Sequence, residues 1–173
     1  MKGLGTLVVL FALALHAAPV PHTRMLDGRH WMTRNFPVNT AGSFCYGDSE
    51  SNCAAYGRLY TWDSALQACT SLDGGWHLPS DAEWDRLAQQ YGGKSAYEPL
   101  LRAGKSGFNV LLGGGRGLDG TYARLEAHGF YWTSTEDGPG TAIYYNFAKG
   151  QKSLFRQSEG EKGRAFSVRC VRE

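Results

Sequence analysis

The chain has 173 residues, which is an ordinary length for one domain. Its 18 basic and 16 acidic side chains give a formal net charge of +2, and this near-neutral balance provides no general field for nucleic acid or an anionic membrane. We therefore expect no nucleic-acid partner. With 23 glycines and 13% aromatic residues, the composition favours a loop-rich domain built on aromatic anchors rather than a helical bundle.

The first 18 residues have the pattern of a secretory signal peptide. Lys2 gives a positive start, residues 4–15 are apolar except for Thr6, and Ala17-Ala18 precede a proline. A membrane anchor is the alternative, but this run is well short of the roughly 20 apolar residues that span a bilayer. We expect residues 1–18 to be removed, leaving a single domain over 19–173 with no membrane span. The protein is then secreted, periplasmic or on the cell surface.

Four cysteines follow the leader segment: Cys45, Cys53, Cys69 and Cys170. An even number in an exported chain predicts two disulfides, and four cysteines allow three pairings. A tetrathiolate zinc site is the alternative, but such sites normally use close cysteine pairs and this sequence has none. Disulfides are therefore favoured.

The first part of the domain predicts a hairpin and then an irregular segment. Asp27-Gly28 suits a tight turn, and it lies between Met25-Leu26 and residues 30–32. Residues 37–58 show no regular pattern, and Cys45 and Cys53 would close a small loop within them.

Two short amphipathic helices are predicted within residues 61–92. Thr61 is suited to accept from the open amides of the first helix, whose apolar face ends at Cys69. Ser80 and Glu83 form a capping box for the second helix, and Gly92-Gly93 end it. Because Cys69 lies on the apolar face, we expect it to point into the core.

The second half predicts a loop and then strands. Residues 104–120 are glycine-rich and are expected to form mostly loop, while short strands are expected at 131–134, 142–148 and 152–157, the last two joined by a hairpin turn at Lys149-Gly150-Gln151. In the last segment Phe166, Val168 and Cys170 alternate with polar residues, so a closing strand would place Cys170 inward. Cys69 and Cys170 are therefore natural partners.

The ordered set of motifs resembles a known family. The runs YGRLYTWDSALQAC, GWHLPSDAEWDRL, YWTSTE and FSVRCV are similar to those of the Fibrobacter succinogenes major paralogous domain, over roughly residues 25–173. The second run also resembles the RLPTEAEWE motif of formylglycine-generating enzymes. The resemblance implies an α+β, C-type-lectin-like domain with two short helices beside short antiparallel strands, paired termini and a long irregular loop region. It also implies the Cys69–Cys170 pairing. The paralogous-domain family has no established activity.

Catalytic chemistry is not expected from these residues. The enzymes on this fold bind copper and oxidise a substrate cysteine through two nearby reactive cysteines in the C-terminal half, where this chain has only Cys170. No histidine lies at helical metal-binding spacing, and a structural role is expected for His77. Residues 113–117 are glycine-rich but lack the helix start or Lys-Ser/Thr ending of a phosphate loop, so we interpret them as a permissive turn region.

Calcium is a separate possibility because many lectins of this fold bind sugar through it. The sugar-binding motifs EPN, QPD and WND are absent, so no cofactor is expected. The weak calcium candidates are Asp119, Glu136 and Asp137, whose carboxylates could supply hard oxygen ligands. The alternative for Glu136-Asp137 is a solvated acidic turn.

The remaining hypothesis is a binding surface. By strand alternation Tyr144, Asn146, Arg156 and Arg169 occupy positions that could face outward, and aromatic and arginine side chains are favoured at recognition surfaces. They could equally pack under loops. The sequence thus favours an extracellular binding module for a glycan or protein ligand, without catalysis. The alternatives are an enzyme of the formylglycine-generating type with an unrecognised site, or a variable binding protein diversified by a retroelement.

Overall fold

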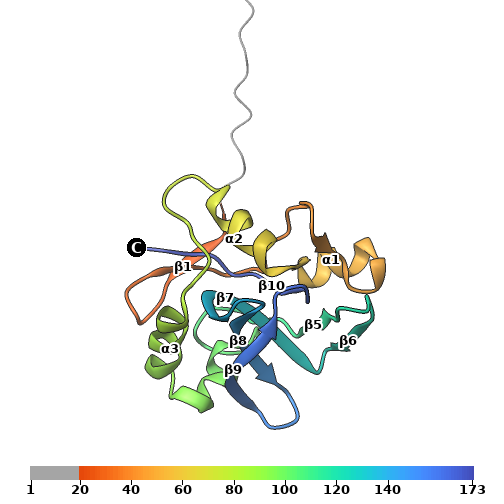
Figure 1. Ribbon diagram of the computed structural model, residues 1–173. Coiled ribbons are helices and arrows are strands. Elements are labelled where there is room, and N and C mark those ends of the chain that lie inside the picture. The colour runs from red at the N-terminus through yellow and green to blue at the C-terminus, as the bar shows by residue number, and fades with distance from the viewer. Residues whose placement is uncertain (1–19) are drawn as a thin grey trace, which may run out of the picture.

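The computed structural model describes residues 20–173, so the expected signal peptide, residues 1–18, lies outside the described part of the chain. Within that part the architecture is α+β, with short helices and mostly strands in curled sheets, as the sequence predicts (Figure 1). The helices are α1 (Glu50–Tyr56), α2 (Trp62–Thr70), α3 (Asp81–Gln90) and α4 (Tyr97–Leu100), with 3-10 turns η1 (Tyr46–Asp48) and η2 (Gly93–Ala96). The strands are β1 (His22–Arg24), β2 (His30–Met32), β3 (Ser43–Phe44), β4 (Leu59–Tyr60), β5 (Gly113–Arg116), β6 (Tyr122–Leu125), β7 (His128–Gly138), β8 (Thr141–Ala148), β9 (Ser153–Glu161), β10 (Phe166–Ser167) and β11 (Val171–Arg172).

A small antiparallel sheet, ordered β1-β2-β11, brings the two ends of the domain together. The predicted opening hairpin is confirmed, but its first strand is β1, and Met25 belongs to the turn instead. The loop that joins β1 to β2 is longer than a two-residue turn. Within it the amide of Met25 donates to the carbonyl of Arg29, and the amide of Gly28 donates to the carbonyl of Met25. In Figure 1 the C-terminus lies beside β1.

The larger sheet is built around the long strand β7. Its order is β3-β4-β10-β7-β5-β6, and β8 and β9 extend from β7 as an antiparallel meander. The predicted hairpin turn at Lys149-Gly150-Gln151 is confirmed between β8 and β9. The pairing is mostly antiparallel, but β7 contacts both β5 and β10 in parallel, through Gly129 and Tyr131.

The two predicted helices are present as α2 and α3. In α3 the capping box is complete, because Ser80 Oγ accepts from the amide of Glu83 and Glu83 Oε2 accepts from the amide of Ser80 at 2.8 Å. Thr61 occupies the N-cap of α2, but the prediction that its side chain accepts from the helix amides is wrong. Its hydroxyl donates to Ser64 Oγ at 3.0 Å instead.

Three segments differ from the sequence-based expectations. The segment expected to be irregular contains α1, which is too short for a hydrophobic period to reveal. The glycine-rich region expected to be loop contains β5. In place of the single closing strand that was expected, the structure has two short strands in different sheets, β10 and β11. Residues 165–171, which include most of both strands and the residues between them, are all buried, so both faces of this segment are covered. Alternation therefore fails as a guide to orientation there.

The core has two adjoining aromatic clusters. One surrounds Trp84 of α3, and the other contains Trp132 of β7 and the Cys69–Cys170 disulfide. The tryptophans at 62, 76, 84 and 132 are all buried in this core. No helix in residues 20–173 is both long enough and apolar enough to cross a bilayer.

Candidate functional site

An open pocket of about 470 Å³ lies between the β5–β6 hairpin and the sheet formed by β7 and β8. In Figure 1 this hairpin forms the right edge of the molecule. The pocket combines an aromatic floor with a charged rim. It is lined by Gly115, Arg116, Gly117, Leu118, Asp119, Thr121, Ala123, Arg124, Phe130, Tyr144, Glu161, Arg164 and Phe166.

The glycines of β5 make room for the aromatic floor. A Cβ on Gly115 would lie 3.1 Å from both Phe130 and Phe166, which is too close without movement of the rings. Gly114 has φ +64, and a Cβ there would lie 2.5 Å from the carbonyl oxygen of Ala123. The interpretation of this run as a permissive turn is therefore wrong, because Gly115 permits a close approach of β5 to the rings and Gly114 permits a close approach of β5 to β6.

The floor itself is a packed group of three rings. The ring centroid of Phe166 lies 5.0 Å from that of Phe130 and 4.9 Å from that of Tyr144. Tyr144 is half-buried, and burial raises the pKa of its hydroxyl despite the nearby Arg164 guanidinium. The hydroxyl therefore stays protonated at neutral pH and can act as a hydrogen-bond donor.

The rim contains three arginines and two acids. Arg164 pairs with Glu161 at 2.6 Å. Arg116 lies with its guanidinium carbon 4.1 Å from the ring centroid of Phe44, and its Nε is buried without a hydrogen-bond partner. Arg124 is exposed. Neither Arg116 nor Arg124 forms an ion pair within residues 20–173.

Of the four predicted binding residues, only Tyr144 lines this pocket. Asn146 lies further along β8, where its Oδ1 is 2.9 Å from Nδ1 of His128. Arg156 lies on β9 and binds Asp81 with Nε 2.9 Å from Oδ1. The structure thus separates Asn146 and Arg156 from the pocket and gives each a partner within the domain.

Arg169 packs inside the domain, which is one of the two orientations that the sequence left open, and it is therefore not a surface binding residue. Its side chain is fully buried, and it donates to Asn35 Oδ1 at 2.7 Å and to the carbonyl oxygens of Met32, Phe108 and Asn109 at 2.6–2.9 Å. Burial lowers the pKa of the guanidinium. Arg169 is therefore a structural residue that joins three segments of backbone.

The three calcium candidates are each engaged locally. Asp119 accepts from the hydroxyl of Thr121 at 2.7 Å and from its amide, and these bonds lower the pKa of the carboxyl. Glu136 pairs with Lys162 at 2.7 Å. Asp137 accepts from the amide of Glu159, and this bond lowers its pKa. Among the described residues these three do not form a group with ligand atoms within 4.8 Å of one another.

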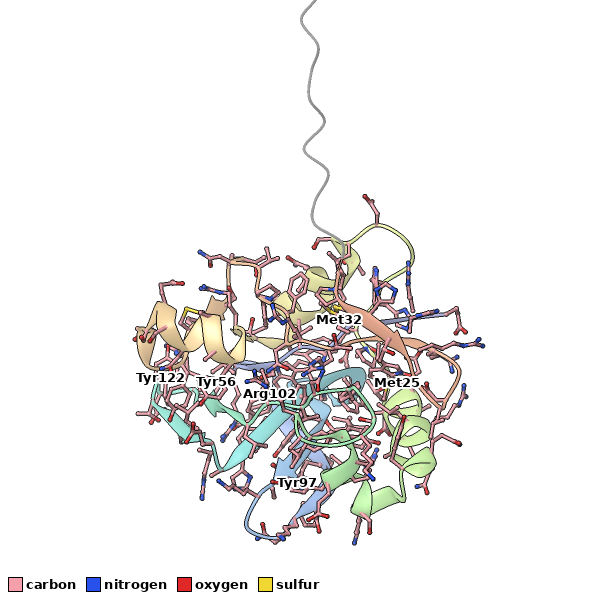
Figure 2. The ribbon with its side chains drawn as sticks, turned by 180° about the vertical axis from the view of Figure 1, so that it is seen from behind. Met25, Met32, Tyr56, Tyr97, Arg102 and Tyr122 are labelled. Atoms are coloured by element: carbon pink, nitrogen blue, oxygen red, sulfur yellow. A yellow bond between two sulfur atoms is a disulfide. The ribbon has the colours of Figure 1, made fainter. Side chains whose placement is uncertain are left out.

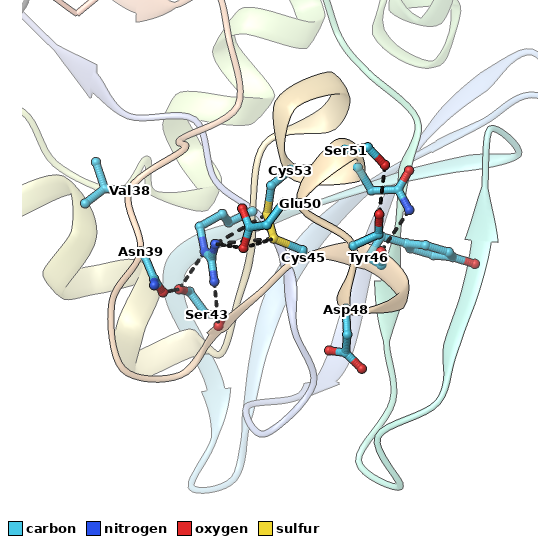
Figure 3. Close-up of a disulfide and its surroundings, with 12 residues drawn as sticks. Val38, Asn39, Ser43, Cys45, Tyr46, Asp48, Glu50, Ser51 and Cys53 are labelled. Atoms are coloured by element: carbon cyan, nitrogen blue, oxygen red, sulfur yellow. Dashed lines mark hydrogen bonds and ion pairs between the residues drawn. A yellow bond between two sulfur atoms is a disulfide. The ribbon is translucent and has the colours of Figure 1, made fainter.

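Both predicted disulfides, Cys45–Cys53 and Cys69–Cys170, are confirmed. The long bridge lies in the core with both cysteines fully buried. The short bridge is different, because charged side chains contact it. Nη1 of Arg58 lies 3.3 Å from Cys45 Sγ, and Figure 3 shows the carboxylate of Glu50 beside the sulfurs. All four cysteines of the chain are paired.

Sequence reasoning missed the pocket arginines and Arg58. Arg116 is the one charged residue in the run Gly113–Gly117, a signal that could have marked the segment for more than backbone flexibility. Arg58 lies in the YGRLY run and could have been noticed as a charge beside buried positions. The expected structural role of His77 is confirmed by its 2.9 Å contact with Glu83.

The comparisons with known proteins agree with the resemblance seen in the sequence. A model of the Fibrobacter succinogenes major domain family matches residues 25–172. No curated protein matches the chain. The match spans nearly all of the described residues, from the turn of the opening hairpin to the closing strand, and the chain therefore belongs to the Fibrobacter succinogenes major domain family.

Proposed function

We propose that this domain is a secreted or surface-displayed binding module that holds a glycan in the pocket between the β5–β6 hairpin and β8. The observation that carries the proposal is the aromatic floor of Phe130, Tyr144 and Phe166 beneath a rim of charged side chains. Sugar rings present an apolar face and a polar edge, and this pocket offers a partner for each.

The size of the pocket favours a glycan over a protein ligand. A volume of about 470 Å³ lies in the range of small-molecule sites. A stable protein interface instead needs roughly 800 Å² from each partner and a broad, well-packed surface. A saccharide of one or two rings suits the observed pocket, with further rings extending into solvent.

The rim favours a sugar that carries a carboxylate or sulfate. Arg116 and Arg124 have no acidic partner in the described chain, whereas the two rim acids are already engaged, Asp119 by Thr121 and Glu161 by Arg164. A guanidinium binds a carboxylate or sulfate in a forked geometry, which adds specificity to the stacking contact.

Catalysis is not part of the proposal. The enzyme alternative of the formylglycine-generating type needs two reactive thiols in the C-terminal half, and the one cysteine there, Cys170, is bonded to Cys69 in the core, which supports binding instead. Export is proposed from the signal-like leader and is supported by the two disulfides, which persist in oxidising compartments. We also propose a C-type-lectin-like fold, supported by the paired ends of the domain, the two amphipathic helices and the Cys69–Cys170 bridge.

The experiment is a glycan-array screen of the purified domain, followed by calorimetry with the best acidic saccharide and its neutral analogue. Each titration is run once with calcium and once with a chelator. The comparison also tests whether Asp119, Glu136 and Asp137 hold a calcium ion that ligand binding requires. We expect Tyr144→Ala to weaken binding at least about tenfold, equivalent to about 1.4 kcal/mol.

A matched pair of arginine variants separates this pocket from the rest of the surface. Arg164 and Arg156 are similarly exposed and each pairs with one carboxylate, but only Arg164 lines the pocket. Arg164→Gln should weaken binding of the acidic saccharide, and Arg156→Gln should leave it unchanged. Equal effects of the two variants, or no glycan bound by the folded domain, would overturn the proposal.

A further inference from the structure

The Cys45–Cys53 bridge lies against a buried cation. Cys45 precedes the η1 turn and Cys53 lies in α1 (Figure 3). Nη1 of Arg58 is 3.3 Å from Sγ of Cys45 and 3.5 Å from Sγ of Cys53. The contact with Arg58 gives it a chemical environment that the long bridge lacks.

Arg58 is held in place by groups other than the sulfurs. Its Nε donates to Ser43 Oγ at 3.0 Å, its Nη2 donates to the Ser43 carbonyl oxygen at 3.3 Å, and the residue is only 8% exposed. The nearest carboxylate, that of Glu50, is 3.8 Å away on a side chain that is 87% exposed. Nη1 therefore points at sulfur, which is a weak acceptor in a disulfide and a much stronger one as a thiolate.

The two sulfurs differ in access. Cys45 is 5% exposed and has the closer contact with Arg58, whereas Cys53 is partly exposed on α1. An attacking thiolate therefore reaches Cys53, and the departing electron pair falls on Cys45, beside the guanidinium. Exchange is faster when the departing thiolate is stabilised.

We propose that the Cys45–Cys53 bridge is a thiol–disulfide exchange site, with Cys53 as the attacked sulfur and Cys45 as a leaving thiolate stabilised by Arg58. The co-reactant is a dithiol present as its monothiolate. Its thiolate bonds to Cys53 Sγ, the Cys45–Cys53 bond breaks, and the electron pair stays on Cys45.

The second thiol of the reductant completes the reaction. It attacks the reductant-side sulfur of the mixed disulfide and passes its proton to Cys53, which leaves as a thiol. The reductant is oxidised to a disulfide, and the protein bridge is reduced by two electrons to one thiolate and one thiol.

A metal site is the other use of this cluster, because ligand atoms of Cys45, Glu50 and Cys53 lie within 4.8 Å of one another. Two facts favour exchange. The sulfurs are already joined in a bridge, and the Arg58 cation beside them would repel a metal ion.

Exchange at this site would act on a defined part of the fold. The segment containing η1 and α1 contacts the β5–β6 hairpin through two hydrogen bonds, from Tyr122 to Asp48 and from Tyr56 to Glu126, each 2.6 Å long. Figure 2 labels Tyr56 and Tyr122 on the same side of the molecule. Reduction would remove the covalent restraint on that segment and leave the core bridge intact.

The test uses the full oxidised domain. It is incubated with dithiothreitol under native conditions, quenched with iodoacetamide at intervals and mapped by peptide mass spectrometry. Cys45 and Cys53 should be alkylated at least ten times faster than Cys69 and Cys170. With glutathione in place of the dithiol, the trapped mixed disulfide should be on Cys53.

Two variants should shift the reduction rate in opposite directions. Arg58→Gln removes the cation beside the leaving sulfur and should slow reduction at least tenfold, with Arg58→Lys retaining part of the rate. Glu50→Gln removes an exposed carboxylate whose Oε1 is 3.4 Å from Cys45 Sγ, and it should speed reduction severalfold. If Arg58→Gln does not fold, the Glu50→Gln rate and the position of the mixed disulfide decide. Simultaneous opening of both bridges, glutathione on Cys45, or a slower Glu50→Gln variant would overturn the proposal.

Discussion

The guanidinium of Arg169 donates through Nε to the side-chain oxygen of Asn35 at 2.7 Å, deep in the domain and 134 residues away along the chain. Asn35 also donates through Nδ2 to the Tyr56 carbonyl oxygen at 2.8 Å. This pair therefore links the segment after the opening hairpin, the end of α1 and the closing segment. Within residues 20–173 no carboxylate takes part in the hydrogen bonds of Arg169, so carbonyl and amide oxygens, together with the rings of Phe108 and Tyr131, compensate its buried charge.

Replacement of Arg169 by methionine should lower the free energy of unfolding by about 3–5 kcal/mol, because the carbonyl oxygens of Met32, Phe108 and Asn109 lose the donor that Arg169 provides. Urea denaturation followed by tryptophan fluorescence measures the loss. The control is Arg156→Met, which breaks a half-exposed ion pair and should change stability by about 0–1 kcal/mol. Similar losses for the two variants would contradict the assigned role of Arg169.

The two disulfides should contribute unequally to stability. In the chain-entropy model the Cys69–Cys170 bridge, which spans 101 residues, is worth about 4–5 kcal/mol, and the Cys45–Cys53 bridge, which spans 8, is worth about 2–3 kcal/mol. Alanine replacement of both cysteines in each pair, measured by urea denaturation, tests the difference. A larger loss for the short bridge would show that it does more than restrain the unfolded chain.

Gly160 should not tolerate a methyl group. A Cβ there would lie 2.6 Å from Tyr144, 2.7 Å from the Ala142 carbonyl oxygen and 2.9 Å from Trp132. Gly160→Ala should therefore destabilise the domain by about 1–3 kcal/mol. Gly150→Ala places its methyl in open space and should change stability by less than about 0.5 kcal/mol. Thermal melts of the two variants suffice, and equal melting temperatures would refute the predicted contact.

Glu83 should make stability depend on pH in the acid range. Burial would raise the pKa of its carboxyl, but hydrogen bonds from Ser80 and His77 outweigh it and hold the pKa below the ordinary value of 4.5. A lowered folded-state pKa means that the unfolded chain binds protons first, so the contribution of Glu83 is complete above about pH 4.5 and is lost as pH falls through the folded pKa.

Glu83→Gln should therefore lower stability by about 1–2 kcal/mol at pH 7 and should lose less further stability than wild type between pH 5 and about pH 3. Urea denaturation at a series of pH values gives both slopes. Glu98→Gln, in an exposed ion pair with Lys152, is the control and should follow wild type. If the plots of unfolding free energy against pH were parallel for Glu83→Gln and wild type, the Glu83 carboxylate would be excluded as the source of the acid-range pH dependence.

Features encoded within a few neighbouring residues were readable from the sequence. Ser80 and Glu83 predicted the start of α3 because a capping box is closed by two residues three positions apart. The turn around Gly150 was predicted for the same local reason. The Cys69–Cys170 pairing was predicted because Cys69 ends the apolar face of a helix and because the family resemblance implies this pair, although the alternation around Cys170 did not distinguish an inward face. Family membership followed from the order of these local motifs.

The burial of a side chain and its neighbours from distant segments were decided only by the tertiary structure, because they depend on which other segments pack against it. Strand alternation assigns Arg169 to one of two faces, but it does not reveal that both faces of the closing segment are covered, and so Arg169 is buried. Tyr144 was identified as a binding candidate, whereas its neighbours in the pocket, Arg116 and Arg164, come from segments separated along the chain. The contact of Arg58 with the Cys45–Cys53 disulfide likewise could not be predicted, because local periodicity does not show which side chain packs against the bridge. Contacts between distant segments form only when the chain packs, because burial and approach depend on the whole fold rather than on local periodicity.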